Sequence, residues 1–118
     1  MSGDNKLAPK EDVARALLLR GSLFVHLDPR CDGVELPETV SCEPHVMLQL
    51  GLDLPVPIPD LRVDDHGICG TLSFARTPFR CVIPWDAVYA ICGEDGRGMV
   101  WPASMPLEVE DEVLRELG

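Results

Sequence analysis

The feature that most constrains the fold lies in residues 46–101, where short strand-like segments alternate with turn signals. The segments are rich in β-branched and aromatic residues, and glycine, proline and aspartate separate them. Such alternation predicts a β-rich domain with many short strands. The strand candidates along the chain are residues 23–27, 34–36, 46–50, 61–63, 68–74, 79–83, 88–92 and 99–101.

The connections between these strands predict how they pair. Residues 64–67 and 75–78 are both of hairpin length, so residues 61–83 should form an antiparallel meander. Three prolines within residues 54–60 cannot all donate to a ladder, so this segment should run extended along an edge or over the surface. Residues 84–87 resemble one helical turn before a strand, which is typical of small SH3-like barrels. The sequence therefore predicts a mainly β fold, a small and partly open SH3-like or Sm-like barrel preceded by a helix.

The preceding helix is expected over residues 9–20. Proline suits its first turn, acidic residues follow at the positive end of the helix dipole, and Gly21 would end it. Val13, Leu17 and Leu18 belong to an apolar arc wider than packing on one small sheet requires. We expect this arc to form a homodimer interface. The alternative is that its leucines sink into a groove of the same subunit.

Length and composition indicate one domain, since 118 residues with 46% hydrophobic content suffice for one core. The expected organisation is a flexible arm over residues 1–8, a domain over 9–106 with its barrel at 22–102, and an acidic helix or tail over 107–118. No segment reads as a membrane span or signal peptide, which favours a cytoplasmic location. The net charge of −10 repels phosphate backbones, so nucleic acid is an unexpected ligand.

Chemical motifs are sparse. No GxSxG elbow or cysteine-centred signature is present, so we expect no enzyme activity and no cofactor. The five cysteines are odd in number and widely spaced, which favours reduced thiols over a disulfide framework. One alternative is a structural zinc site formed by the C-x-x-H pair Cys42 and His45 with the H-x-x-C pair His66 and Cys69. We expect these pairs to be accidental and no metal to be required.

Four segments carry a resemblance to a known family: SLFVHLDPRCDGVELPE, LQLGLD, LSFARTPFRCVIPWDAVYAI and EDGRGMVWP. In this order they resemble SspB, the dimeric bacterial adaptor that holds ssrA-tagged proteins for the ClpXP protease. The resemblance covers roughly the middle two thirds of the chain. It implies a non-enzymatic homodimer, formed through the N-terminal helix, that presents one hydrophobic peptide groove per subunit.

Carried over by position, the resemblance also implies which residues contact the tag. The residues expected to bind the peptide are Gln49, Leu50, Phe74, Ala75, Arg76, Arg80, Met99 and Trp101. The alternative for the strand leucines, Leu50 among them, is that they belong to the core as in any strand, and the alternative for Arg76 is that it is a solvated hairpin charge. An added peptide strand at a barrel edge would supply main-chain affinity, while side-chain pockets would read its sequence.

The resemblance further implies ClpX as a partner, because SspB proteins dock on ClpX through a basic and hydrophobic C-terminal motif. The sequence ends in LEVEDEVLRELG, which is acidic and in which that motif is not recognised. Two other functions stay open at this point. One is a metal-stabilised interaction domain with no proteolytic role, and the other is an Sm-like nucleic-acid binder, which the charge disfavours.

Overall fold

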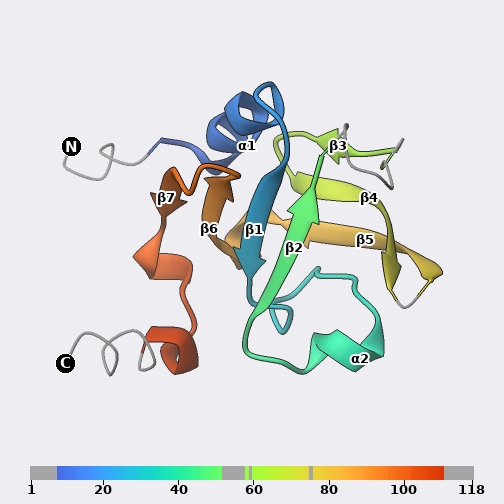
Figure 1. Cartoon of the computed structure of the whole chain (residues 1–118). Helices are drawn as coiled ribbons and strands as arrows, with labels where there is room; N and C mark the ends of the chain where they lie inside the picture. The colour runs from blue at the N-terminus through green and yellow to red at the C-terminus, as the bar shows by residue number, and fades with distance from the viewer. Residues whose placement is uncertain (1–7, 52–57, 59, 75, 111–118) are drawn as a thin grey trace.

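The computed structural model describes residues 8–51, 58, 60–74 and 76–110, and it is mainly β with a helix near the N-terminus (Figure 1). Along the chain the elements are α1 (Lys10–Leu18), β1 (Leu23–Leu27), α2 (Glu38–Ser41), β2 (Val46–Leu50), β3 (Arg62–Val63), β4 (Gly67–Phe74), β5 (Thr77–Pro84), η2 (Trp85–Ala87), β6 (Val88–Gly93), β7 (Gly98–Val100) and η3 (Pro102–Ser104).

The strands form two antiparallel sheets. The four-stranded sheet has the order β2-β1-β6-β7, and the three-stranded sheet has the order β3-β4-β5. The predicted meander over residues 61–83 and the helical turn before β6 are confirmed. Residues 34–36 do not form a strand but make one isolated bridge, in which Glu35 and Val82 exchange backbone hydrogen bonds of 2.9 and 3.1 Å. No closed barrel forms among the described residues.

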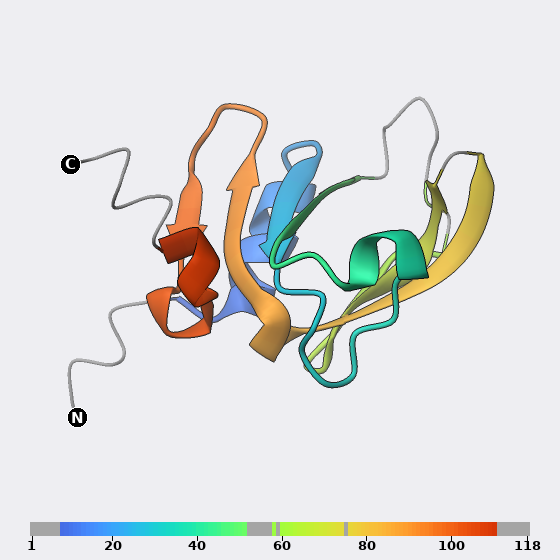
Figure 2. The ribbon, with the colours of Figure 1, turned by 90° about the horizontal axis from the view of Figure 1, so that it is seen from below.

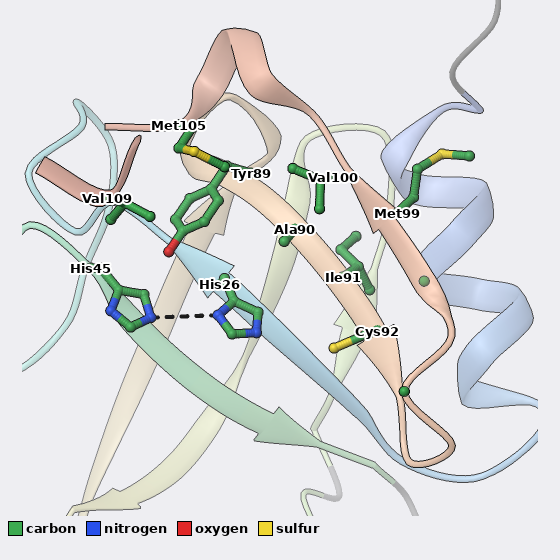
Figure 3. A pocket seen from close by; sticks show the side chains of 12 residues that line it. His26, His45, Tyr89, Ala90, Ile91, Cys92, Met99, Val100, Met105 and Val109 are labelled. Carbon is green, nitrogen blue, oxygen red and sulfur yellow. Dashed lines mark hydrogen bonds between the residues drawn. The ribbon is translucent and has the colours of Figure 1, made fainter. Parts of the chain in front are cut away.

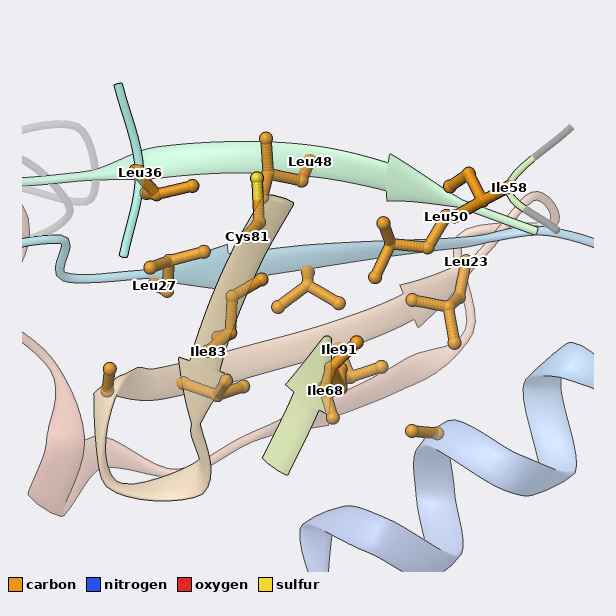
Figure 4. Close-up of a cluster of buried hydrophobic side chains, with 14 of the residues drawn as sticks. Leu23, Leu27, Leu36, Leu48, Leu50, Ile58, Ile68, Cys81, Ile83 and Ile91 are labelled. Carbon is orange, nitrogen blue, oxygen red and sulfur yellow. The ribbon is translucent and has the colours of Figure 1, made fainter. Parts of the chain in front are cut away.

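The core lies between the two sheets. Leu23, Val25 and Leu27 alternate along β1 and are fully buried on one face, as period-two alternation requires. Cys81 and Ile83 of β5 cross over this face and reach the same cluster, together with leucines of β2 and Ile91 of β6 (Figure 4). Within the described part of the chain, the opposite face of the four-stranded sheet carries no second sheet, as the view from below shows (Figure 2).

Helix α1 spans nine residues rather than the predicted twelve, and the positive φ of Gly21 follows soon after its end. Its Ala14 is fully buried, while Val13, Leu17 and Leu18 are partly buried and pack against the core of the same chain. The three expected dimer residues therefore make intrachain contacts, which was the alternative interpretation of the apolar arc. The exposed apolar residue at this end is Leu19, whose side chain is 90% exposed.

Two residues of the N-terminal region fasten the segment after β7. The Lys10 ammonium donates to the Trp85 carbonyl at 2.7 Å and to the Ser104 hydroxyl at 2.9 Å. The indole N–H of Trp101 donates to the Ala8 carbonyl at 3.2 Å. Residues 107–110 then form a helical turn, consistent with the helix expected there. Residues 1–7 of the predicted arm, residues 54–57 and 59 of the predicted extended segment, and the chain after residue 110 lie outside the described residues.

None of the described helices is both long and apolar enough to cross a membrane.

A paired substitution tests the core. Leu27→Ala should lower the free energy of unfolding by about 2–5 kcal/mol, because it leaves a cavity beside fully buried neighbours. Leu107→Ala removes the same atoms from a side chain that is 74% exposed, and it should change stability by less than about 0.5 kcal/mol. Urea unfolding of both variants measures the difference, and equal losses would contradict the assigned core.

Candidate functional site

A groove of about 550 Å³ lies on the face of the four-stranded sheet that points away from the core (Figure 3). We call it the outer-face groove. It is bounded by β1, β6, β7 and the segment that follows β7. The twelve residues that line it are His26, His45, Tyr89, Ala90, Ile91, Cys92, Gly96, Gly98, Met99, Val100, Met105 and Val109.

The floor of the outer-face groove is built from small residues. Ile91 points into the core, so its neighbours Ala90 and Cys92 point outward into the groove. Gly98 lies beside Cys92 in the β6–β7 ladder. A Cβ atom on Gly98 would lie 2.0 Å from the carbonyl oxygen of Ile91, so only glycine permits this close approach of the two strands. Small side chains at these positions leave the space that the groove occupies.

A register shift in β6 brings Tyr89 into the groove. His26 of β1 pairs with Ala90, whereas the next residue, Leu27, pairs with Val88, so Tyr89 is left over as a β-bulge. Bulges of this kind re-aim a side chain that regular alternation would send to the other face. The Tyr89 ring consequently stands beside His26, with ring centroids 6.0 Å apart (Figure 3).

Two histidines form the polar part of the wall. Nδ1 of His26 and Nε2 of His45 are 3.4 Å apart, and the rings are nearly parallel with centroids separated by 5.6 Å. His26 extends outward from the middle of β1, and His45 directly precedes β2. Partial burial lowers the pKa of His26, and the nearby His45 lowers it further because the two imidazolium charges would repel. His26 is therefore biased toward its neutral form and can accept a proton when an anion approaches.

The opposite wall comes from Met105 and Val109, which lie beside Tyr89 (Figure 3). A two-pronged ion pair anchors the turn that carries them, since the Arg30 guanidinium contacts the two Glu108 oxygens at 2.8 and 3.1 Å. Hydrogen bonds from Arg30 lower the pKa of Glu108 to about 2. Arg30 also pairs with Asp28, immediately after β1. The same arginine thus connects the end of β1 to the far wall of the groove.

The charge of the outer-face groove differs from that of the whole protein. Acidic residues make up 20 of the 118 residues, and the formal net charge is −10. None of the twelve lining residues is acidic, and the two histidines are its only groups that can become positive near neutral pH. The groove is thus an apolar channel with a latent positive charge on one wall.

Met99 is the one residue of the sequence-predicted site that lines this groove, and it does so mainly through its backbone. Its side chain points toward α1, away from the histidines (Figure 3), and packs against the core cluster. Its neighbour Val100 is 46% exposed and pairs with Ala90, so Val100 presents the apolar side chain to the groove.

The structure places other predicted contact residues in structural roles. Leu50 is 1% exposed, because it occupies an inward position of β2, and it belongs to the core. Trp101 is 7% exposed, with its indole N–H bonded to Ala8 and the Lys10 ammonium 5.8 Å from its ring centroid. The expectation that Leu50 and Trp101 line an open groove is therefore wrong for this conformation. Gln49 is exposed and donates to the Ser22 hydroxyl at 3.2 Å.

Phe74, Arg76 and Arg80 belong to the β4–β5 hairpin, whose tip lies on the other side of the molecule from β7 (Figure 1). Phe74 is partly buried against the core cluster, and Arg76 is exposed with φ of 70°, as a tight hairpin turn requires. Arg80 lies 3.9 Å from the Asp60 carboxylate. Ala75 lies outside the described residues. The structure therefore does not bring the hairpin residues and Met99 into a single groove.

The alternative zinc site is not assembled either. His45 lies against His26, whereas His66 is exposed next to Asp65, at 3.6 Å. Over the described part of the chain, no three His, Cys, Asp or Glu side chains gather in a way that could hold a metal ion.

A scan of the sequence against protein-family models and a search of curated proteins found no match. The SspB resemblance therefore stays a prediction.

The sequence reasoning did not assign His26 and Tyr89 to a site. The sequence does indicate the direction of His26. It stands between Val25 and Leu27 in a strand, so it must face away from the core when they face toward it. No sequence pattern indicates the direction of Tyr89, because the bulge that turns it depends on the register between β6 and β1.

Removal of metal ions tests whether the protein contains the alternative zinc site. Treatment with a chelator should leave the melting temperature unchanged, because the four residues of the alternative site lie apart and folding needs no metal to join them. Differential scanning calorimetry with and without chelator measures this. One zinc ion per chain in freshly purified protein, together with a lower melting temperature after chelation, would overturn it.

Proposed function

We propose that this protein is a non-enzymatic adaptor that binds an extended, largely apolar peptide in the outer-face groove. The observation that carries the proposal is the groove itself, which has about 550 Å³ of space over a floor of small residues. Apolar clefts with a few convergent polar groups are the usual form of binding sites. Methionine and valine on its wall give adaptable apolar contact of the kind that peptide-binding surfaces use.

The strand beside the groove adds a main-chain component. Within the described part of the chain β7 pairs only with β6, so its other side is a sheet edge. The N–H of Trp101 donates to the Tyr89 carbonyl at 2.7 Å, and ladder bonds alternate along a strand. The backbone groups of Gly98 and Val100 therefore point away from β6. A peptide leaving the groove over this edge could hydrogen-bond to them.

The kind of peptide and its destination follow from the resemblance to SspB. We propose that the peptide is a degradation tag of ssrA type and that the tagged protein passes to ClpXP. Two sheets packed around one core are compatible with the partly open SH3-like barrel that the resemblance implies. The reduced state of all five cysteines fits a cytoplasmic adaptor.

A bulky side chain on the floor of the groove tests the proposed site. Ala90→Trp should weaken binding of a labelled ssrA-type peptide at least about tenfold, because the indole would fill the space over β6. Ser73→Trp is the matched control, since Ser73 is an exposed strand position near the β4–β5 tip. Fluorescence anisotropy measures both affinities, and circular dichroism verifies that both variants fold.

The results distinguish a peptide site in the outer-face groove from one at the β4–β5 hairpin. If Ser73→Trp and Phe74→Ala weaken binding while Ala90→Trp does not, the peptide site lies at the hairpin and the groove assignment fails. If wild-type protein binds no tag peptide at millimolar concentration, the adaptor proposal fails.

We also propose that the protein is a homodimer formed through the end of α1, where Leu19 is 90% exposed. Leu19→Asp should yield monomers that unfold at nearly the same temperature as the wild type, because this side chain makes no core contact. Leu17→Asp should instead unfold the chain, since Leu17 packs against the core and a charge there would be buried unpaired. Sedimentation of a wild-type monomer at micromolar concentration would contradict the dimer.

A further inference from the structure

Formation of the core does not require the contact between His26 and His45. Both rings lie on the outer side of the four-stranded sheet, and their facing nitrogens are 3.4 Å apart. Two neutral imidazoles share one hydrogen bond at such a contact, while two protonated ones would repel each other. Solvated charged residues could occupy the same outward positions at no cost. The pair instead places two titratable groups on the wall of an otherwise apolar groove.

The surroundings leave the pair without an anionic partner of its own. The groups facing His26 are His45 before β2 and Tyr89 and Cys92 of β6. The acidic residues nearest along the chain are Asp28 and Glu43, each two residues from a histidine of the pair, and Glu108 lies in the turn that carries the opposite wall. Arg30 holds Asp28 and Glu108, and among the described residues Glu43 makes no ion pair with either histidine. Burial and the charge of His45 are what lower the pKa of His26, and no carboxylate opposes them. A carboxylate brought by a ligand would therefore be the first to form an ion pair with these histidines.

We propose that the His26–His45 pair binds an acidic side chain of the peptide in the outer-face groove, and that binding takes up a proton. This inference rests on the proposed peptide-binding function. It names the ligand as an extended peptide that carries a Glu or Asp between apolar residues. The absence of acidic side chains among the lining residues, in a protein of net charge −10, matches a ligand of that charge.

An acidic side chain fits the position better than a chain end does. His45 is exposed at the rim, so a peptide backbone can pass the pair and continue in either direction. The groove also extends beyond the histidines to Gly96 and Gly98, which carry no side chains. A side chain reaching sideways to the rim would meet both imidazoles while its neighbours contact Val100 and Met105.

The sign of the pH dependence follows from linkage. In the free protein burial favours the neutral form of His26, so a bound carboxylate raises the pKa of His26 by favouring its imidazolium form. Protons are then taken up on binding, and affinity rises as the pH falls through the histidine range. A rise of about one unit in that pKa makes binding about tenfold tighter below the range than above it. Replacing the peptide carboxylate by an amide removes the effect.

The experiment uses two fluorescein-labelled ssrA-type tag peptides, both amidated at the C-terminus. One carries a single Glu and its twin carries Gln at that position. Anisotropy titrations of the full chain are made at about pH 6 and about pH 8, on either side of the ordinary histidine pKa. We expect the Glu peptide to bind about tenfold more tightly than its twin at the lower pH and nearly equally at the higher one.

Three variants locate the effect. His45→Gln and His26→Gln should each bind the Glu peptide with little pH dependence, and His45 is exposed, so its replacement should not disturb folding. His66→Gln is the matched control, because His66 is 90% exposed on a loop of the three-stranded sheet and should retain the wild-type response. NMR titration of the imidazole nitrogens should show the pair taking up its proton at higher pH with the Glu peptide bound.

Different results would contradict the recognition of an acidic side chain and the proposed peptide binding itself. If both peptides bind equally at both pH values, the peptide site stands and the acidic side-chain recognition is wrong. A pH response seen only with a third peptide, the Gln twin with a free C-terminal carboxylate, would overturn the side-chain assignment. Binding of neither peptide would remove the function on which the inference rests.

Discussion

Strand β1 is the element on which both faces of the protein depend. It pairs with β2 on one side and with β6 on the other, and its alternate residues Leu23, Val25 and Leu27 are completely buried. The same alternation that fixes the core side chains necessarily turns His26 to the opposite face. A one-residue slip of β1 would exchange the two sets. The register of β1 therefore determines both the core and the outer-face groove.

Much of the fold could be predicted because local signals and tertiary structure agree. Strands β1 and β2 begin and end where the sequence predicted, and β3 and β4 pair across the predicted hairpin-length connection. Whether the barrel closes was harder to predict from the sequence. Closure of two sheets around a core depends on pairing between strands that are far apart in the chain. The isolated bridge of Glu35 to Val82 is an example, since neither segment encodes it alone.

The candidate site was harder to predict because it depends on contacts between distant segments. The wall carrying Met105 and Val109 is held by Arg30 and Glu108, which are separated by 78 residues in the chain. Transfer of positions from a family resemblance placed Trp101 at a binding surface, but its indole is instead tied to the N-terminal segment. The resemblance suggested the class of ligand, whereas the described geometry moved the expected binding surface to the other side of the molecule.

The central claim is that the outer face of the four-stranded sheet binds the peptide, and backbone NMR tests it most directly. Addition of an unlabelled ssrA-type peptide to isotope-labelled protein should shift the amide signals of Ala90, Cys92 and Val100 progressively. Signals from the β4–β5 hairpin, including Arg76 and Arg80, should stay in place. Shifts confined to that hairpin, with β6 and β7 unaffected, would contradict the account.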